Sequence, residues 1–356
     1  MMKEIMEQPK AIQDTISCVL HDGRIDLNAV GLSDDELRKI SKIYIAACGS
    51  AWHVGMAAQY VIEDLARIET RVELASEMRY RTFPFAKDSI LIVISQSGET
   101  ADTLAALRKA KECGVKTVAV VNVLGSSIAR EADYPFYTVA GPEISVATTK
   151  AYSAQLVALY AFALNLALAR GTIDQEKYNY YVSEVATISS KVEELFKKKQ
   201  TIQRLANRHA NAEDVFFIGR GIDYAVGLEG SLKLKEISYI HSEAYAAGEL
   251  KHGTISLIEK NTLVVALLSQ PSLIEKTISN AVEVKARGAT VIALDMSGDE
   301  AVKKAVDNVI AIPSIDPHFA ASLVVIPLQL FAYYVAVNRG LDVDKPRNLA
   351  KSVTVE

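Results

Sequence analysis

The feature that most constrains the fold is an arrangement of residues that occurs twice along the chain. Apolar runs that end in Ser-Gln occupy residues 90–96 and 263–270, and their serines, Ser95 and Ser269, are 174 residues apart. Self-similarity at one fixed separation is the mark of a duplicated unit. The chain therefore contains two copies of one unit, at about residues 40–170 and 210–340. The same separation relates three further pairs: Gly114 and Gly288, Asp133 and Asp307, and Gln155 and Gln329.

Within each copy, short apolar runs alternate with helical patterns. Strands that are apolar on both faces and alternate with helices form a parallel sheet covered on both sides. The sequence therefore predicts an α/β protein with two tandem three-layer domains, each built on a parallel sheet, and a C-terminal tail. In the first copy strands are expected at residues 43–47, 72–75, 89–94, 117–121 and 136–139, and in the second the first and third recur at 215–219 and 263–268.

Five parts are expected along the chain. An N-terminal helical segment reads as two short amphipathic helices, and Ser33 with Glu36 resembles a capping box. Two apolar stretches, 151–169 and 320–337, are long enough to span a membrane, but polar residues interrupt both, so we expect buried core helices. The parts are the N-terminal segment 1–39, the first domain 40–171, a helical linker 172–209, the second domain 210–340 and the tail 341–356.

Composition excludes several classes of function. Half of the 356 residues are apolar, 23% are charged and the net charge is −4, which is typical of a globular protein and gives no reason to expect nucleic acid. The three cysteines have neither metal-ligand spacing nor a disulfide framework, and the first residues do not form a signal peptide. We therefore expect a cytoplasmic protein that binds neither membrane nor metal.

Residues 95–100, Ser-Gln-Ser-Gly-Glu-Thr, follow the buried strand of the first copy and precede a helical pattern. The first turn of a helix has unpaired N–H groups and partial positive charge, which suits a phosphate. Ser95, Ser97 and Thr100 add hydroxyl donors, and Gly98 allows close approach of the backbone. Ordinary helix capping needs only one hydroxyl, so the pattern favours an anion site.

The two copies differ at this place. The second copy has Ser-Gln-Pro-Ser, without the glycine or the paired hydroxyls, so the phosphate site belongs to the first copy. In open parallel sheets, ligands bind at the carboxyl ends of strands. Ser50 follows another strand of the first copy, so we expect it to reach the same anion.

Two segments of the second copy contain residues suited to proton transfer. Glu229, Lys233 and Glu236 fall on one face of a predicted helix, and spacing alone favours exposed ion pairs over a base tuned by a lysine. His252 lies in a polar loop bounded by glycines, where a histidine could face a ligand and transfer protons, although an ordinary surface histidine is the commoner case.

The tail, residues 344–356, is not of low complexity. Leu349, Val353 and Val355 are expected to be apolar anchors that hold it over a pocket. A lysine there, such as Lys351, would lose solvation and attack a carbonyl.

Taken together, these segments resemble the isomerase portion of the glucosamine-6-phosphate synthase family, the glutamine–fructose-6-phosphate aminotransferases of the sugar-isomerase (SIS) group. The resemblance covers essentially the whole chain, and the C-terminal motif is the most specific part. It implies two flavodoxin-like sugar-isomerase domains and a homodimer that acts on fructose 6-phosphate without a cofactor. The segments that carry it are residues 95–100, 233–237, 247–253 and 347–356.

The resemblance also implies a role for individual residues. Lys351 would form a Schiff base with the C2 carbonyl, Glu236 would move the proton between C1 and C2, and Lys233 would stabilise charge near the reacting oxygen. His252, from the neighbouring subunit, would open the sugar ring. Arg347 would help to hold the tail. The phosphate would be held by Ser95, Gln96, Ser97 and Thr100, with Ser50 and Thr148 nearby.

The sequence departs from the family pattern in several places. Ala51 and Thr148 stand where serine is usual, and Thr254 stands where proline is common. The glutaminase domain of the full enzyme, with its N-terminal cysteine, is not in this sequence, so we expect either an excised domain or a stand-alone protein, and Met1-Met2 before family-like residues favours excision. The expected reaction is conversion of fructose 6-phosphate and ammonia to glucosamine 6-phosphate. The alternatives are a stand-alone amino-sugar-phosphate deaminase and a non-catalytic sugar-phosphate sensor.

Overall fold

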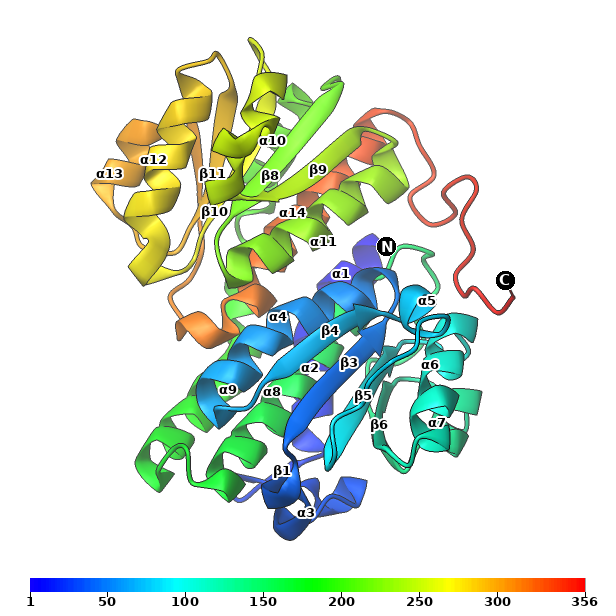
Figure 1. Ribbon diagram of the computed structural model, residues 1–356. Coiled ribbons are helices and arrows are strands. Elements are labelled where there is room, and N and C mark those ends of the chain that lie inside the picture. The colour runs from blue at the N-terminus through cyan, green and yellow to red at the C-terminus, as the bar shows by residue number, and fades with distance from the viewer. Residues whose placement is uncertain (356) are drawn as a thin grey trace. The chain divides into compact units, whose positions relative to one another are not determined.

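The computed structural model describes residues 1–355, and the chain forms two compact units. The first-sheet unit consists of residues 7–143 and 148–189, together with the end of the chain from Ala350. The second-sheet unit consists of residues 1–6, 144–147 and 190–349. Each unit contains one five-stranded parallel sheet, coloured blue to cyan in the first and green to orange in the second (Figure 1).

The first sheet has the strand order β4-β3-β5-β6-β7, and every neighbouring pair is parallel. Figure 1 shows α6 and α7 on one face of this sheet and α4 and α8 on the other. Its strands are β3 (Lys42–Ala47), β4 (Thr70–Leu74), β5 (Ser89–Ser95), β6 (Lys116–Val121) and β7 (Tyr134–Tyr137). The helices of this unit are α2 (Gln8–Ser17), η1 (Leu27–Val30), α3 (Asp34–Lys39), α4 (Gly49–Ala66), α5 (Ala75–Met78), α6 (Ala101–Glu112), α7 (Ser127–Glu131), α8 (Lys150–Arg170) and the first part of α9 (Gln175–Phe196).

The second sheet repeats this topology in the order β9-β8-β10-β11-β12, again with all pairs parallel. Helices α12 and α13 cover one face, and α11 and α14 the other (Figure 1). The strands are β8 (Asp214–Gly219), β9 (His241–Ala246), β10 (Leu263–Leu268), β11 (Thr290–Asp295) and β12 (Asn308–Ala311). The helices are α1 (Met2–Met6), α10 (Lys199–Arg208), α11 (Ile222–Ser238), η2 (Ala247–His252), η3 (Thr254–Leu257), η4 (Pro271–Leu273), α12 (Ile274–Lys285), α13 (Glu300–Ala305), η5 (Pro317–Phe319) and α14 (Ala321–Asn338).

The predicted α/β fold with two parallel sheets is therefore confirmed. In both sheets the second strand in sequence pairs with the outer side of the first, and the third crosses to its other side, which is the flavodoxin-like order. Residues of β5, from Ile90 to Ile94, are at most 2% exposed, as expected for a central strand covered on both faces.

The internal repeat reappears as two matching contacts in each copy. Asp133 accepts a hydrogen bond from the Thr117 N–H at 2.9 Å and pairs with Lys111 at 2.8 Å. At the same separation in the second copy, Asp307 accepts from the Val291 N–H at 2.8 Å and pairs with Lys285 at 3.1 Å. These aspartates pin the start of β6 and β11, so the sequence anchors mark equivalent positions in the two sheets.

Local differences from the predictions lie at edges and in the N-terminal segment. The last strand of the first sheet begins at Tyr134, two residues before the predicted start, because Tyr134 pairs with Val118 and an edge strand tolerates Pro135. The N-terminal segment adds a short hairpin, β1 (Leu20–His21) with β2 (Arg24–Ile25), to its helices. The capping box at Ser33 and Glu36 is present as predicted.

Two helices are long and apolar enough to cross a membrane. They are Lys150–Arg170 and the segment Pro317–Asn338, and their apolar windows are 94% and 83% buried inside the protein. Both therefore serve as core helices, as their polar interruptions predict.

Candidate functional site

The polar residues after β5 form a closed set of hydrogen bonds, here called the strand-end cluster (residues 95–100). Ser95 Oγ lies 2.9 Å from Thr100 Oγ1 and accepts the Gly98 N–H at 3.0 Å. Ser97 Oγ accepts the Glu99 N–H at 3.2 Å. Thr100 is the N-cap residue of the 12-residue helix α6, but its side chain makes no capping bond. The hydroxyls therefore gather around the turn instead of capping the helix.

The structure gives a further reason for Gly98, besides the predicted close approach of the backbone to an anion. Its φ of +65° lies in the left-handed region, and a Cβ there would lie 2.0 Å from Ser126 Oγ. The Gly98 carbonyl also accepts the Ile128 N–H at 3.0 Å. The glycine thus allows the turn to lie against the segment that begins α7, and no direct approach to a ligand is needed to explain it.

Ser50 and Gln96 flank the cluster. Ser50 is 7% exposed in the first turn of α4, and β3, which precedes it, pairs with β5 so that Ala47 lies beside Ile94. The Gln96 carbonyl accepts the Asn122 N–H at 3.2 Å, which ties the loop after β5 to the end of β6. The carboxyl ends of β3, β5 and β6 therefore surround the cluster, the usual ligand position in such sheets.

The C-terminal tail is bonded to this cluster. Ser352 Oγ lies 3.0 Å from Ser97 Oγ, and the Val353 carbonyl accepts the N–H of Ala101, the first residue of α6, at 3.1 Å. The predicted apolar anchors are wrong, because Leu349, Val353 and Val355 are 46%, 56% and 73% exposed. Polar contacts hold the tail instead, since the helix terminus and the serine offer unsatisfied groups.

Lys351 pairs with Glu143, which was not among the residues predicted for the site. Its Nζ donates to Glu143 Oε2 at 2.8 Å, and the Glu143 side chain is completely buried. The other carboxylate oxygen of Glu143 accepts the backbone N–H groups of Thr149 at 2.8 Å and Ala151 at 3.2 Å. Thr148, a predicted site residue, is half-buried beside this helix start. The sequence signal that could have indicated Glu143 is an acidic residue shortly before the start of the long helix α8.

Helix α11 of the second-sheet unit carries the predicted acid–lysine–acid face. Lys233 Nζ lies 2.5 Å from Glu236 Oε2 and 3.5 Å from Glu229 Oε1. The interpretation favoured by spacing alone, exposed ion pairs, is wrong: the Glu229 and Lys233 side chains have 0% exposure, and only Glu236 is partly exposed, at 20%. Gly230 explains the burial, since a Cβ there would lie 2.8 Å from Leu328 of α14.

Opposite charges meet in the group formed by Glu229, Lys233 and Glu236. A buried ammonium held between two carboxylates compensates their charge, and burial of ions is tolerated only with such partners. The partly exposed Glu236 carboxylate is the member of the group that solvent or a ligand can reach.

His252 is exposed and ends the 3-10 helix η2 of the second-sheet unit. The loop around it is tied down: Lys251 pairs with Glu283 at 2.8 Å, and a Cβ on Gly248 would lie 3.1 Å from the Arg220 guanidinium. Arg220 in turn donates to Asn280 at 2.9 Å. The histidine therefore projects from a braced loop.

Arg347 marks the point where the tail leaves the second-sheet unit. Its N–H donates to the Tyr239 hydroxyl at 2.8 Å, and its guanidinium lies 4.2 Å from the centre of the Tyr239 ring. Tyr239 ends α11. A cation over an aromatic face is a stabilising contact, so Arg347 fastens the base of the tail to α11.

The corresponding strand end of the second sheet is filled by an aspartate. Asp223, in the first turn of α11, is 2% exposed and accepts both the backbone N–H of Ser269, at 2.9 Å, and its hydroxyl. Burial raises the pKa of Asp223 to about 6, although the bonds from Ser269 act in the opposite direction.

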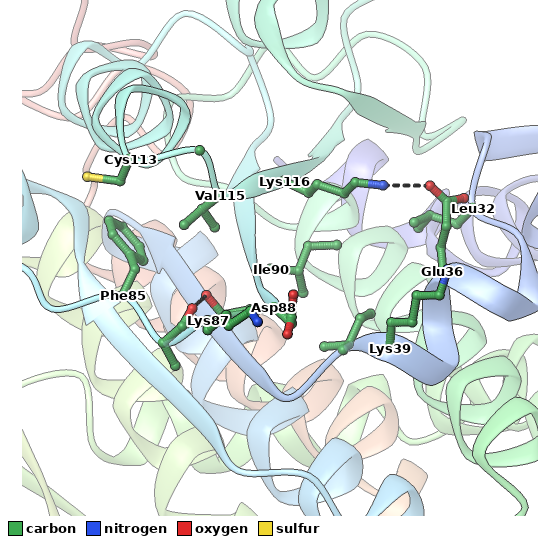
Figure 2. Close-up of a pocket in the computed structure, with 14 residues that line it drawn as sticks. Leu32, Glu36, Lys39, Phe85, Lys87, Asp88, Ile90, Cys113, Val115 and Lys116 are labelled. Atoms are coloured by element: carbon green, nitrogen blue, oxygen red, sulfur yellow. Dashed lines mark hydrogen bonds and ion pairs between the residues drawn. The ribbon is translucent and has the colours of Figure 1, made fainter.

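A cavity of about 540 Å³ opens where β5 and β6 begin, at the edge of the first sheet opposite the strand-end cluster (Figure 2). Apolar Phe85, Ile90 and Val115 line it beside Glu36 and Lys116, whose charged groups are 2.8 Å apart. Hydrogen bonds lower the pKa of Glu36 to about 2, and the bond from Lys116 contributes more than the bond from Tyr134. Among the residues that the structure describes, none of those predicted for the site lines this cavity. The cavity is therefore separate from the candidate site.

Comparison with known proteins identifies related chains. The family model of the SIS domain matches residues 36–165 and 209–339. Glutamine–fructose-6-phosphate aminotransferases [isomerizing] of Caldanaerobacter subterraneus and Clostridium tetani are 55% and 54% identical over all of this chain. The chain spans 59% of the length of each of these relatives.

Solved structures give the same grouping. The C-terminal domain of glucosamine-fructose-6-phosphate aminotransferase from Francisella tularensis has a TM-score of 0.92 and 42% identity, with 97% of both chains covered. A glucosamine-6-phosphate deaminase from Thermotoga maritima has a TM-score of 0.79 at 24% identity, a likeness of fold alone.

Proposed function

Because the chain belongs to the SIS domain family, we propose that it is the sugar-phosphate isomerase part of a glutamine–fructose-6-phosphate aminotransferase. Two matches support this: 42% identity to a C-terminal domain of such an enzyme over 97% of its length, and 55% identity to a curated relative over all of this chain. With ammonia supplied, the chain converts fructose 6-phosphate to glucosamine 6-phosphate. Without ammonia it interconverts the ketose and aldose phosphates.

The strand-end cluster holds the phosphate in this proposal. Hydroxyls of Ser95, Ser97 and Thr100, with Gln96, lie at the amino end of α6, where partial positive charge favours an anion. Ser50 and Thr148 are assigned to the same phosphate. Fixing the phosphate end positions the reacting carbons, which reduces the entropic cost of reaction.

Lys351 is the nucleophile. Its neutral amine attacks the C2 carbonyl carbon of the open-chain sugar, water leaves, and an imine forms that ammonia then replaces. Glu236 moves the proton between C1 and C2, because its carboxylate is the accessible member of the α11 group. Lys233 stabilises charge near the reacting oxygen, and His252 opens the sugar ring.

The observation that carries the proposal is the bonding of the tail to the strand-end cluster. The Ser97–Ser352 contact at 3.0 Å and the Ala101–Val353 hydrogen bond at 3.1 Å keep residues 351–353 beside the hydroxyls assigned to phosphate. A sugar phosphate anchored at one end of such a site needs its electrophilic carbon close to an amine, and Lys351 belongs to this same unit.

The proposal extends to the partners of the chain. We infer a cytoplasmic homodimer in which His252 of one subunit serves the site of the other. The names of the relatives indicate glutamine as nitrogen source, so a glutaminase domain supplies ammonia in the full-length enzyme. Arg347, stacked on Tyr239, holds the tail at its base.

The decisive experiment compares the wild type with Lys351→Ala. The wild type should form glucosamine 6-phosphate from fructose 6-phosphate and ammonium, and glucose 6-phosphate without ammonium. Lys351→Ala should lose about 10³-fold or more of both activities, as expected when a covalent nucleophile is removed. Stabilisation by fructose 6-phosphate in thermal unfolding should persist, because the phosphate contacts remain. Unchanged turnover in the variant would refute the Schiff-base role.

A further inference from the structure

Glu143 has no part in the reaction described so far, yet it makes the closest contact to the proposed nucleophile. Its Oε2 accepts a hydrogen bond from Lys351 Nζ at 2.8 Å, between residues 208 positions apart in the sequence. The lysine side chain is 24% exposed, and that of Glu143 is 0% exposed. A buried carboxylate facing a partly exposed ammonium requires that partner, because an unpaired buried charge is costly.

The carboxylate is fixed from its other side. Oε1 accepts the N–H groups of Thr149 and Ala151 at 2.8 and 3.2 Å, with the Thr149 hydroxyl at 3.4 Å. These groups lie at the amino end of the 21-residue helix α8, whose partial positive charge favours an anion there. One oxygen of Glu143 therefore caps a core helix, and the other is aimed at the tail.

The contacts of Ser352 and Val353 hold the backbone of the tail, but they do not hold the side chain of Lys351. Val353 and Val355 are 56% and 73% exposed, and the long lysine side chain loses rotamer entropy when it is held in one place. The bond to Glu143 is the contact that fixes the amine. It attaches a partly exposed side chain of the tail to a fully buried one.

We propose that Glu143 is the positioning residue for Lys351: it holds the tail lysine, before the sugar arrives, against the capped end of α8. The assignment of Lys351 as nucleophile rests on the proposed function, whereas the contact does not. A role as positioning residue differs from a role as helix cap alone, because only the former uses the negative charge to hold Lys351.

Glu143→Gln separates these two roles. The amide oxygen of glutamine can still accept the N–H groups of α8, but it offers no charge to the lysine. Asp133→Asn is the matched control, because Asp133 also accepts a backbone N–H, at 2.9 Å, and pairs with a lysine, at 2.8 Å, near the start of β6. Glu143→Asp keeps the charge on a shorter side chain and should restore part of any loss.

The first measurement is independent of activity. Trypsin cleaves after lysine, and mass spectrometry follows loss of the residues beyond Lys351, with cleavage after Arg347 as internal reference. Glu143→Gln should raise the rate of cleavage after Lys351, relative to that after Arg347, by about tenfold, the factor that corresponds to a lost charged hydrogen bond. Asp133→Asn should leave this ratio within about twofold of the wild type.

The second measurement is turnover of fructose 6-phosphate with ammonium. Glu143→Gln should lower kcat about tenfold or more while KM stays within about threefold, since the phosphate contacts are intact. An unchanged cleavage ratio at Lys351, or an unchanged kcat, overturns the positioning role. A third outcome is possible: the wild type does not turn over the sugar, but Glu143→Gln is still cleaved faster after Lys351. That result supports the contact and rejects the proposed function instead.

Discussion

The carboxyl ends of the central strands differ between the two sheets, although the strands themselves match. After β5, the hydroxyls of Ser95 and Thr100 bond to each other at 2.9 Å. After β10, the equivalent serine, Ser269, donates its N–H and hydroxyl to Asp223. Asp223 is the second residue of the helix after β8, and Ser50 is the second residue of the helix after β3. One copy has a hydroxyl where the other has a carboxylate.

The difference between Asp223 and Ser50 indicates how the same strand end can have different roles in the two copies. In the second sheet a side chain of the protein supplies the anion for the strand end, and that place is permanently occupied. In the first sheet the same place has donors and no carboxylate at the position of Asp223, which leaves room for the outside anion that we propose. The comparison supports assignment of the phosphate to the first sheet, and it can be tested by exchanging the features of the two ends.

Ser50→Asp should have the largest effect. It gives the first strand end the carboxylate of the second, and a carboxylate beside a phosphate repels it. We expect kcat/KM for fructose 6-phosphate to fall about 10³-fold, in line with the several kcal/mol that like charges cost at a binding site. Steady-state kinetics is the measurement. Ser50→Asn is the uncharged control, and an equal loss in both variants would contradict the electrostatic explanation.

Asp223→Asn should change how stability depends on pH. Because burial raises the folded-state pKa of Asp223 from 3.8 to about 6, the folded protein binds this proton more tightly than the unfolded chain does. The stability this group contributes is therefore complete below about pH 3.8 and is lost as the pH rises through about 6. The variant should remove a decline of ~2 kcal/mol in the free energy of unfolding between pH 4 and pH 7.

Urea unfolding of the wild type and Asp223→Asn across that pH range measures the decline. Glucosamine 6-phosphate synthesis should stay near the wild-type rate, since Asp223 belongs to the strand end that is already filled. Parallel pH curves for the two proteins would be evidence against a buried titrating carboxylate at this place.

Thr100→Val should produce a smaller, local effect. Valine keeps the shape of threonine but removes the hydroxyl that contacts Ser95, so KM for fructose 6-phosphate should rise about tenfold, the value of one hydrogen bond to a charged group, with kcat little changed. Ser272→Ala is the control in the second copy, where Ser272 is exposed. A similar rise in KM for the control would remove the distinction between the two ends.

The smallest effects should be similar in the two copies, with a somewhat larger loss for Asp133→Ala because Asp133 also accepts the Thr117 hydroxyl at 2.9 Å. Asp133→Ala and Asp307→Ala each remove a backbone acceptor and a half-exposed ion pair, and each should lower the free energy of unfolding by about 1 kcal/mol. Thermal unfolding monitored by calorimetry is the measurement. Clearly unequal losses would show that the shared contacts do not contribute equally to the two sheets.

The sequence predicted the features that depend on local pattern. Apolar runs such as residues 90–94 gave the central strands, the capping box at Ser33 is present, and the spacing of Asp133 and Asp307 found equivalent positions. Pattern also found the Ser95 cluster, because a strand end with three hydroxyls is a local signal. Edge strands shifted, since their limits depend on pairing with a neighbour.

The features that the sequence did not predict depend on what covers a residue. Helical spacing put Glu229 and Lys233 on one face, but it could not reveal that α14 buries that face beside Gly230. Glu143 was missed because its partner, Lys351, lies 208 residues away and no spacing rule connects them. The tail was expected to dock through apolar side chains, and those are exposed, since backbone and hydroxyl groups do the binding.

The carboxylate of Asp223 has one more consequence, which concerns how metabolism acts on the lifetime of the protein. A unit that contains its own anion depends less on metabolite supply for its stability, whereas a unit that binds the phosphate of the sugar, as proposed, gains stability by mass action as sugar phosphate accumulates. During starvation the first-sheet unit would then be the earlier of the two to open to proteases. The supply of sugar phosphate would thereby influence the abundance of the protein through the stability of its first-sheet unit.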